Sequence, residues 1–313
     1  MRTVYLGTSD FAVSVLDRLA DSPHRPVLVV TRPDRPRGRG RRLSPPPVAE
    51  AARALGIETI QPESVNSDEA RAAISAAEPE SVCICAYGAL IKEPLLSEHP
   101  MLNVHPSLLP RWRGAAPIER SIDAGDEETG VSIMRPIMEM DAGPVCLQRV
   151  EPIEPGDDFG SLSARLAKLG GELLVEALDT RPPFEEQTED GVTIAPKIGP
   201  DDRRLDGSLD AAAAARRVRA LNPHVGTFLE LPDGERLGVR RAAVAAEPGE
   251  ALPGGAAPRP GDSPPPGAVA AVDGRLLYGC ADGPLEMIEV QPAGGRPMDA
   301  AAYLRGHGAR LAG

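Results

Sequence analysis

Short apolar runs alternate with helix-like patterns along the first half of the chain. Five runs have the length and composition of buried strands: Thr3 to Leu6, Pro26 to Thr31, Ile57 to Ile60, Ser81 to Ala86 and Leu102 to His105. Between them, Phe11, Val15 and Leu19 share one helical face behind a cap at Thr8 or Ser9, and Val48 to Leu55 forms another helical segment. This alternation predicts an α/β, Rossmann-like domain with a parallel sheet and crossover helices.

The same domain is predicted to continue to about residue 180. Thr129 to Met134 and Val145 to Val150 are two further strand candidates, and Leu162, Leu166, Leu169 and Leu173 lie on one face of a helix. We therefore expect a first domain over residues 1–180. Residues 181–206 are polar and contain several prolines, which predicts a linker across the surface.

A second domain is expected over residues 207–313. It begins with a helical pattern and continues with short β-like runs, which predict a small β-barrel. The segments are Leu209 to Leu221, Thr227 to Leu231, Arg236 to Val244, Ala268 to Val272, Leu276 to Cys280 and Glu286 to Val290. The stretch Ala246 to Gly267 is rich in Pro, Gly and Ala and predicts a mobile loop.

Composition excludes several classes of protein. Hydrophobic residues make up 42% of the chain, no apolar run approaches the length of a membrane span, and the N-terminus lacks a signal-peptide pattern. We therefore expect a cytoplasmic protein that does not bind membranes. The four cysteines are too scattered for a disulfide framework or a zinc site, and Cys83 and Cys85 fit buried strand positions, so no metal is expected.

Charge is distributed unevenly along the chain. The net charge of −12 argues against indiscriminate binding to nucleic acid, but one segment is strongly basic. Its arginines are Arg32, Arg35, Arg37, Arg39, Arg41 and Arg42. This segment is either a solvated loop or a phosphate-binding element, since guanidinium groups pair well with phosphate oxygens.

Candidate chemistry lies at the end of the fifth strand. In a strand, residues two apart project to the same side, so Asn103 and His105 place an amide donor beside an imidazole. The carboxyl ends of strands in open α/β sheets are where sites form. Asp141 follows at a turn between two later strands, where it either orients His105 or only makes an Asx-turn. For Trp112, packing and ligand binding are equally compatible with the pattern.

The turn after the first strand does not predict a nucleotide cofactor. Gly7-Thr8-Ser9-Asp10-Phe11 joins a strand to a helix, but a single glycine is too few for a dinucleotide-binding motif. We therefore expect neither nicotinamide nor flavin.

Several motifs together resemble the methionyl-tRNA formyltransferase family over nearly the whole chain. They are Gly7 to Ala12, the basic segment Arg32 to Leu43, Asn103 to Pro117, Gly125 to Gly143, Ala220-Leu221-Asn222-Pro223, and Leu285 to Met298.

The resemblance implies both an activity and site residues. The family transfers the formyl group of 10-formyltetrahydrofolate, a co-substrate, to methionyl initiator tRNA for translation initiation, with no metal. It implies that Asn103, His105 and Asp141 are catalytic, that Ser107, Leu108, Leu109 and Pro110 contact folate, and that the second domain is an OB-like barrel that assists tRNA binding. It further implies tRNA contacts by Arg35, Arg37, Arg39, Arg41 and Arg42. No obligate protein partner is expected.

Two rival hypotheses remain. A formyltransferase acting on a small amine, such as a sugar nucleotide or glycinamide ribonucleotide, could use the same three catalytic residues. A non-catalytic tRNA-binding or folate-sensing protein is the rival of another class, and intact Asn103, His105 and Asp141 count against it.

Overall fold

The computed structural model describes residues 1–37, 42–245 and 263–307. The chain divides into two compact units. The first unit comprises Met1–Pro117, Glu128–Pro152 and Ser163–Pro196, and the second comprises Ile118–Glu127, Ile153–Leu162 and Lys197–Gly313. Residues 185–195, which lie in the segment expected to connect the two domains, are hydrogen-bonded to strands of the first unit.

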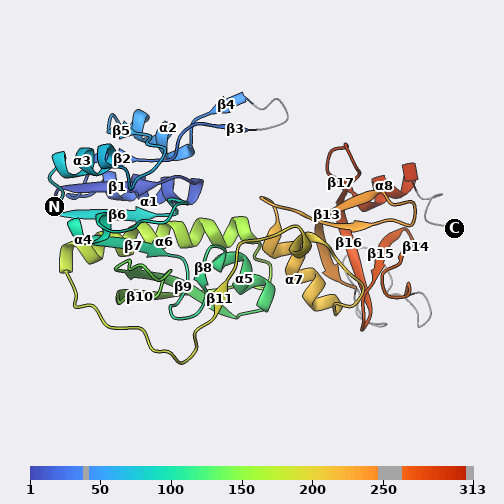
Figure 1. The fold of residues 1–313 in the computed structure, drawn as a ribbon. Coiled ribbons are helices and arrows are strands. Elements are labelled where there is room, and N and C mark those ends of the chain that lie inside the picture. The colour runs from blue at the N-terminus through green and yellow to red at the C-terminus, as the bar shows by residue number, and fades with distance from the viewer. Residues whose placement is uncertain (38–41, 246–262, 308–313) are drawn as a thin grey trace. The chain divides into compact units, whose positions relative to one another are not determined.

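The first unit is built on a seven-stranded sheet with the order β10-β9-β7-β6-β1-β2-β5, which can be followed in Figure 1. Its strands are β1 (Thr3–Gly7), β2 (Pro26–Val30), β5 (Glu58–Ile60), β6 (Ser81–Cys85), β7 (Met101–His105), β9 (Glu128–Met134) and β10 (Val145–Pro152). All seven were predicted from apolar runs, and the structure confirms them.

The expectation of a parallel sheet holds for five of these strands. β7, β6, β1, β2 and β5 pair in parallel, whereas β9 is antiparallel to β7, and β10 is antiparallel to β9. Only residues 135–144 connect β9 to β10, and a parallel pairing needs a crossover of about a dozen residues or more. The sheet is therefore mixed, with its antiparallel strands at one edge.

Helices cover both faces of this sheet. Val4, Leu6, Val82 and Ile84 form one apolar face with residues of two helices, α3 (Asp68–Ala76) and α4 (Leu95–Glu98). On the other face lie α1 (Asp10–Ala20) and α6 (Phe159–Thr180), while α2 (Pro47–Ala54) packs beside α1. The helices α1, α2 and α6 were expected from their apolar spacing, whereas α3 and α4 were not.

A glycine allows α6 to lie close to β7. A Cβ atom on Gly170 would stand 2.8 Å from Cγ1 of Val104, the residue between Asn103 and His105. Because residues alternate along a strand, Val104 packs against α6 while Asn103 and His105 project to the opposite side. The helix thus fixes the strand that carries the candidate chemistry.

The second unit contains an antiparallel sheet with the order β12-β13-β16-β15-β14, and β17 pairs with β16. These strands are β12 (Thr227–Glu230), β13 (Arg236–Val244), β14 (Val269–Val272), β15 (Arg275–Gly279), β16 (Pro284–Gln291) and β17 (Met298–Asp299). All but β17 were predicted. Of the predicted loop Ala246 to Gly267, residues 246–262 lie outside the described residues.

The core of the second unit forms where helices meet this sheet. Ala214 and Val218 of α7 (Ala211–Leu221) and Tyr303 of α8 (Ala300–His307) are buried against apolar strand residues such as Val239 and Leu285. The helix predicted from Leu209 to Leu221 corresponds to α7. Two short elements complete the unit, α5 (Pro117–Ala124), whose first residue belongs to the first unit, and the 3-10 helix η1 (Asp201–Arg203).

Candidate active site

His105 lies at the carboxyl end of β7 between two oxygen atoms from distant segments. Its Nε2 is 2.9 Å from the carbonyl oxygen of Trp112, and its Nδ1 is 3.6 Å from Oδ2 of Asp141. Because a carbonyl oxygen only accepts, Nε2 carries a hydrogen and donates it. The carboxylate thus faces the second ring nitrogen at a distance just beyond that of a direct hydrogen bond.

Asp141 belongs to the turn between β9 and β10. Its φ angle is 52°, in the left-handed region that non-glycine residues seldom occupy. The backbone N–H of Gly114 donates to Oδ2, with 3.0 Å between the atoms, and this is the oxygen that faces His105. The carboxylate is therefore held by the loop after β7 as well as by its own turn. The structure brings it to His105, as the sequence hypothesis required.

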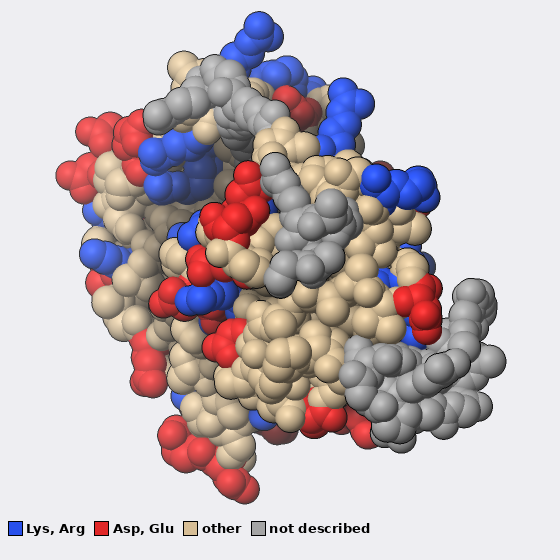
Figure 2. Space-filling model, turned by 90° about the vertical axis from the view of Figure 1, so that its right-hand side faces the viewer, with Lys and Arg blue, Asp and Glu red and all other residues tan. Residues whose placement is uncertain are grey.

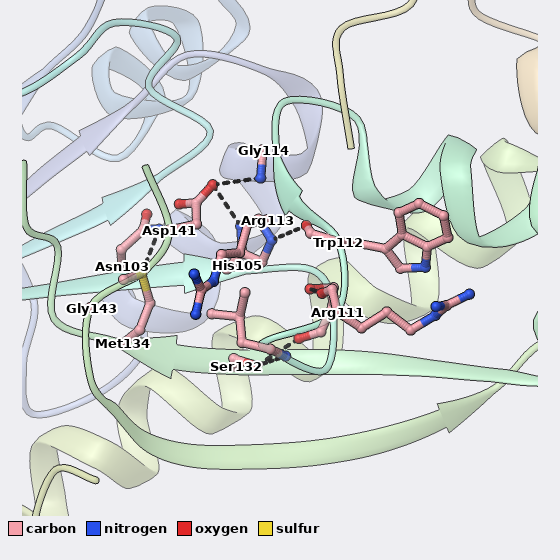
Figure 3. A network of polar contacts seen from close by, with 12 residues as sticks. Asn103, His105, Arg111, Trp112, Arg113, Gly114, Ser132, Met134, Asp141 and Gly143 are labelled. Atoms are coloured by element: carbon pink, nitrogen blue, oxygen red, sulfur yellow. Dashed lines mark hydrogen bonds and ion pairs between the residues drawn. The ribbon is translucent and has the colours of Figure 1, made fainter. Parts of the chain in front are cut away.

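Asn103 projects from the same side of β7 as His105, as Figure 3 shows. Its Nδ2 donates to the sulfur of Met134 over 3.5 Å. A thioether is a weak acceptor, so a stronger acceptor such as an oxyanion readily replaces it. Within this cluster, the hydrogen bond from Asn103 to Met134 is therefore the one that a ligand oxygen most easily replaces.

The segment Ser107 to Pro110 is fixed by two polar side chains, the buried Ser132 and the exposed Gln148. Ser132 donates to the carbonyl of Ser107 (2.6 Å) and accepts from the N–H of Leu109 (3.1 Å). Gln148 donates both to the carbonyl of Leu109 and to the hydroxyl of Ser132. These bonds hold the turn that leads from His105 toward Trp112.

The four residues expected to contact folate differ in exposure. Ser107 is fully buried and its hydroxyl donates to the carbonyl of Arg111, and Leu109 is also buried. Leu108 and Pro110 are half-buried. A ligand would therefore meet this segment through its main chain and through Leu108 and Pro110.

Trp112 contributes its main chain to the site, while its ring turns elsewhere. Figure 3 shows the indole directed away from His105, and the guanidinium of Arg111 lies 4.5 Å from the ring centroid. The φ angle of Trp112 is 63°, again left-handed. Arg113 is buried, and its Nε donates to Oε1 of Gln187.

The turn after β1 caps α1. The Ser9 hydroxyl accepts from the N–H of Ala12, and Thr8 donates to the carbonyl of Tyr87. Of the two cap candidates, Thr8 and Ser9, it is therefore Ser9 that caps α1.

The basic segment begins and ends as a short antiparallel hairpin of β3 (Arg35–Arg37) and β4 (Arg42–Ser44). Arg35 and Arg42 are exposed. Arg39 and Arg41 lie outside the described residues, as does the side chain of Arg37. Among the described residues of this basic segment, no arginine bonds to His105 or Asp141.

Sequence reasoning missed the residues that support this site. Gln187 and Thr193, both placed in the predicted linker, bond to the Asp141 turn and to the Trp112 loop. Ser132 and Gln148 lie on strands, where they appeared as ordinary alternating positions. For Gln187 and Thr193, the sequence shows only that an amide and a hydroxyl lie in a segment without apolar periodicity.

The structure also bears on the cysteines, metal sites and membrane spans. Cys83 and Cys85 are fully buried, as predicted, and burial raises the pKa of each thiol to about 12. Within residues 1–37, 42–245 and 263–307, no group of three or more His, Cys, Asp or Glu is arranged to hold a metal ion. No helix of that same part is long and apolar enough to cross a membrane.

Comparison with known proteins identifies the family. Residues 1–178 match the family described as "Formyl transferase", and residues 197–308 match "Formyl transferase, C-terminal domain". A protein named methionyl-tRNA formyltransferase from Halorhodospira halophila is 43% identical over 97% of this chain and 96% of its own length. Another of that name from Methylococcus capsulatus is 41% identical over 98% of this chain and 97% of its own.

A solved structure shares the fold at low identity. HypX from Aquifex aeolicus, determined in complex with tetrahydrofolic acid, has a TM-score of 0.62 and 19% identity over 100% of this chain. The match covers 48% of HypX, so the chain spans about half the length of that protein. The identities to curated relatives over almost the whole sequence, together with the two family matches, show that the chain belongs to the methionyl-tRNA formyltransferase family.

Proposed function

We propose that this protein transfers the formyl group of 10-formyltetrahydrofolate to the amino group of methionyl initiator tRNA, which supplies formylmethionyl-tRNA for translation initiation. The observation that carries the proposal is the position of His105 between the Trp112 carbonyl and the Asp141 carboxylate, beside Asn103. Family membership, with 43% identity to a curated relative, supports the assignment of this arrangement as the formyl-transfer centre.

In the proposed reaction the neutral amine attacks the formyl carbon of the folate. The carbonyl oxygen becomes an oxyanion, the bond between that carbon and N10 of the folate breaks, and the amine loses one proton while N10 gains one. Asn103 donates to the oxyanion, and such a donor is typically worth about a hundredfold to a thousandfold in rate. His105 stabilises the same charge, and Asp141 orients His105 and takes up the amine proton directly or through water.

The folate is proposed to bind along Ser107, Leu108, Leu109 and Pro110. Support comes from the rigidity of this segment, whose carbonyl and N–H groups are fixed by Ser132 and Gln148. With Ser107 and Leu109 buried, we assign the side-chain contacts to Leu108 and Pro110.

The tRNA is proposed to contact Arg35, Arg37, Arg39, Arg41 and Arg42. Arg35 and Arg42 lie exposed on the two strands of a hairpin, where their guanidinium groups are accessible to phosphates. Figure 2 shows acidic and basic side chains interspersed over the face in view, which is consistent with a net charge of −12. Recognition of an anionic partner therefore depends on a local basic cluster.

We further propose a division of labour along the chain. Residues 1–180 form the catalytic domain, residues 181–206 the connection, and residues 207–313 an OB-like barrel that binds tRNA. The antiparallel sheet of the second unit and its match to the C-terminal family domain support the last assignment. We expect the protein to act in the cytoplasm without an obligate protein partner.

The test is a formylation assay with purified protein, 10-formyltetrahydrofolate and methionyl initiator tRNA, in which formylmethionine is measured after deacylation of the tRNA. Product that disappears in the Asn103→Ala, His105→Ala and Asp141→Asn variants supports the proposal. Turnover of a sugar-nucleotide amine or of glycinamide ribonucleotide, without formylation of the tRNA, would overturn it in favour of a small-amine formyltransferase. Tight binding of tRNA or folate with no product would identify a non-catalytic binding protein.

A further inference from the structure

Residues 185–195, which we call the strap, lie against the candidate active site. The strap joins the first unit at both ends through its main chain. At one end Glu185 exchanges two hydrogen bonds with Val145, and at the other β11 (Ile194–Ala195) pairs in parallel with β8 (Arg113–Gly114). A segment attached in this way is docked without help from its side chains.

Two strap side chains nevertheless bond to the two segments that flank His105. The hydroxyl of Thr193 accepts from the backbone N–H of Trp112 over 2.8 Å. The Nε2 of Gln187 donates to the carbonyls of Asp141 (2.8 Å) and Gly143 (2.7 Å). In each case the strap reaches a residue that itself contacts the imidazole.

Gln187 links these two segments to each other. While its Nε2 holds the Asp141 turn, its Oε1 accepts from Nε of Arg113 over 3.0 Å. Arg113 follows Trp112 directly in the chain. The side-chain amide of Gln187 thus uses both hydrogens and its oxygen to connect the turn at Asp141 to the loop at Arg113, and these two segments flank the imidazole of His105.

Backbone strain explains why such ties are needed. Trp112 and Asp141 have φ angles of 63° and 52°, and a non-glycine residue persists in this region only where surrounding contacts enforce it. If either residue relaxed, the Trp112 carbonyl or the Asp141 carboxylate would move away from His105. Thr193 and Gln187 bond to the main chain of the strained residues themselves.

We propose that Gln187 and Thr193 are positioning residues, which fix the Trp112 carbonyl and the Asp141 carboxylate on opposite sides of His105 and so set the proton position and orientation of its ring. Both act on His105 through Trp112 and Asp141, to which they bond. The catalytic consequence rests on the proposed formyl transfer, whereas the effect on the imidazole exists without any substrate.

The kinetic test compares isosteric pairs on the full-length protein. Gln187→Met removes the amide but keeps the length of the side chain, and Thr193→Val removes only the hydroxyl. A displacement of about 1 Å costs up to about a hundredfold in rate, so we expect kcat to fall about 10- to 100-fold while KM for the folate changes less than about threefold. Thr193→Ser, which keeps the hydroxyl, should retain most of the activity.

The matched control is Thr188→Val in the same strap. Thr188 is exposed and donates only to the carbonyl of Asp190, so this variant should behave like the wild type. Equal losses in Thr188→Val and Thr193→Val would show a general loosening of the strap and overturn the proposal. Wild-type kcat in Gln187→Met would also overturn it.

A substrate-free measurement separates this proposal from the proposed function. Long-range ¹H–¹⁵N spectra resolve ring nitrogens, and with five histidines in the chain the His105 signals can be assigned by their loss in His105→Gln. In the wild type we expect a protonated Nε2, and in Gln187→Met and Thr193→Val a mixture of ring states. Unchanged His105 signals in both variants would overturn the positioning role even if the enzyme formylates tRNA. Altered signals in a protein that forms no formylmethionine would leave the positioning role standing and overturn only the function.

Discussion

Replacing Ser132 with alanine tests whether the turn after β7 is held by one buried hydroxyl. Ser132 is completely buried, and its hydroxyl makes three hydrogen bonds: it donates to the Ser107 carbonyl and accepts from the Leu109 N–H and the Gln148 amide. These three bonds saturate the hydroxyl, which has one donor and two acceptor positions. Alanine removes all three and puts no polar atom in their place.

The magnitude follows from what remains unpaired. Gln148 keeps its bond to the Leu109 carbonyl, but the Leu109 N–H and the Ser107 carbonyl each lose the Ser132 hydroxyl. A buried group that loses its partner costs about 1–3 kcal/mol, so with two such groups Ser132→Ala should lower the free energy of unfolding by about 2–6 kcal/mol. With a urea m-value of about 2 kcal/mol/M, the unfolding midpoint should fall by about 1–3 M.

The assay is urea unfolding followed by the fluorescence of Trp112, the single tryptophan, which lies on the loop in question. Ser14→Ala is the control, because Ser14 is exposed on α1, where such changes usually stay within about 0.5 kcal/mol. A midpoint in Ser132→Ala within about 0.3 M of the control would refute the reasoning, since that is at most about 0.6 kcal/mol at this m-value.

Four further predictions follow from single contacts. Gly170→Ala should lower the thermal midpoint although alanine favours helices, because its Cβ would stand 2.8 Å from Val104, whereas Gly156→Ala, with open space around it, should not. Arg35→Ala with Arg42→Ala should weaken tRNA binding and flatten its dependence on salt, measured by filter binding, and should leave folate binding unchanged. An alkylating reagent should modify half-exposed Cys146 first in the native protein, as read by mass spectrometry, because burial raises the pKa of Cys83 and Cys85 to about 12. Arg120→Met should destabilise the second unit at pH 7, because hydrogen bonds from Arg120 lower the pKa of Asp202. A lowered carboxyl pKa stabilises the folded state at pH values above the unfolded pKa near 3.8, and this stabilisation is lost as the pH falls through the folded pKa. The difference in urea midpoint between the variant and the wild type should therefore disappear in acid.

The strands of the first unit could be predicted because their signal is local. A run such as Val4-Tyr5-Leu6, buried on both faces of the sheet, is apolar at every position, and the sequence shows this directly. The alternation of side chains along a strand likewise predicted that Asn103 and His105 project from the same side of β7. The direction of β9 beside β7 has no local mark in an apolar strand, whereas the ten-residue connection 135–144 already favours an antiparallel β10.

The distance between His105 and Asp141 could not be read from the sequence. The two residues are separated in the sequence by β8, α5 and β9, and their contact depends on how β9 returns beside β7. The motif resemblance supplied the pairing, but the structure supplies its geometry, including the Trp112 carbonyl on the other ring nitrogen. The role of that carbonyl cannot be read from the sequence, because every residue has a backbone carbonyl group.

The side-chain contacts of the strap could not be predicted from the sequence for a related reason. Its residues bury little apolar surface, and their polar composition is also that of a surface connection, so only the identity of the partner atoms separates the two. Left-handed backbone would ordinarily suggest glycine, yet Trp112 and Asp141 occupy it while Gly114 and Gly143 stand two residues further on. Local preference and tertiary structure thus disagree at the two residues that flank His105. Such disagreement is expected where function constrains the chain, and it persists here because Thr193 and Gln187 bond to those residues from outside the local sequence.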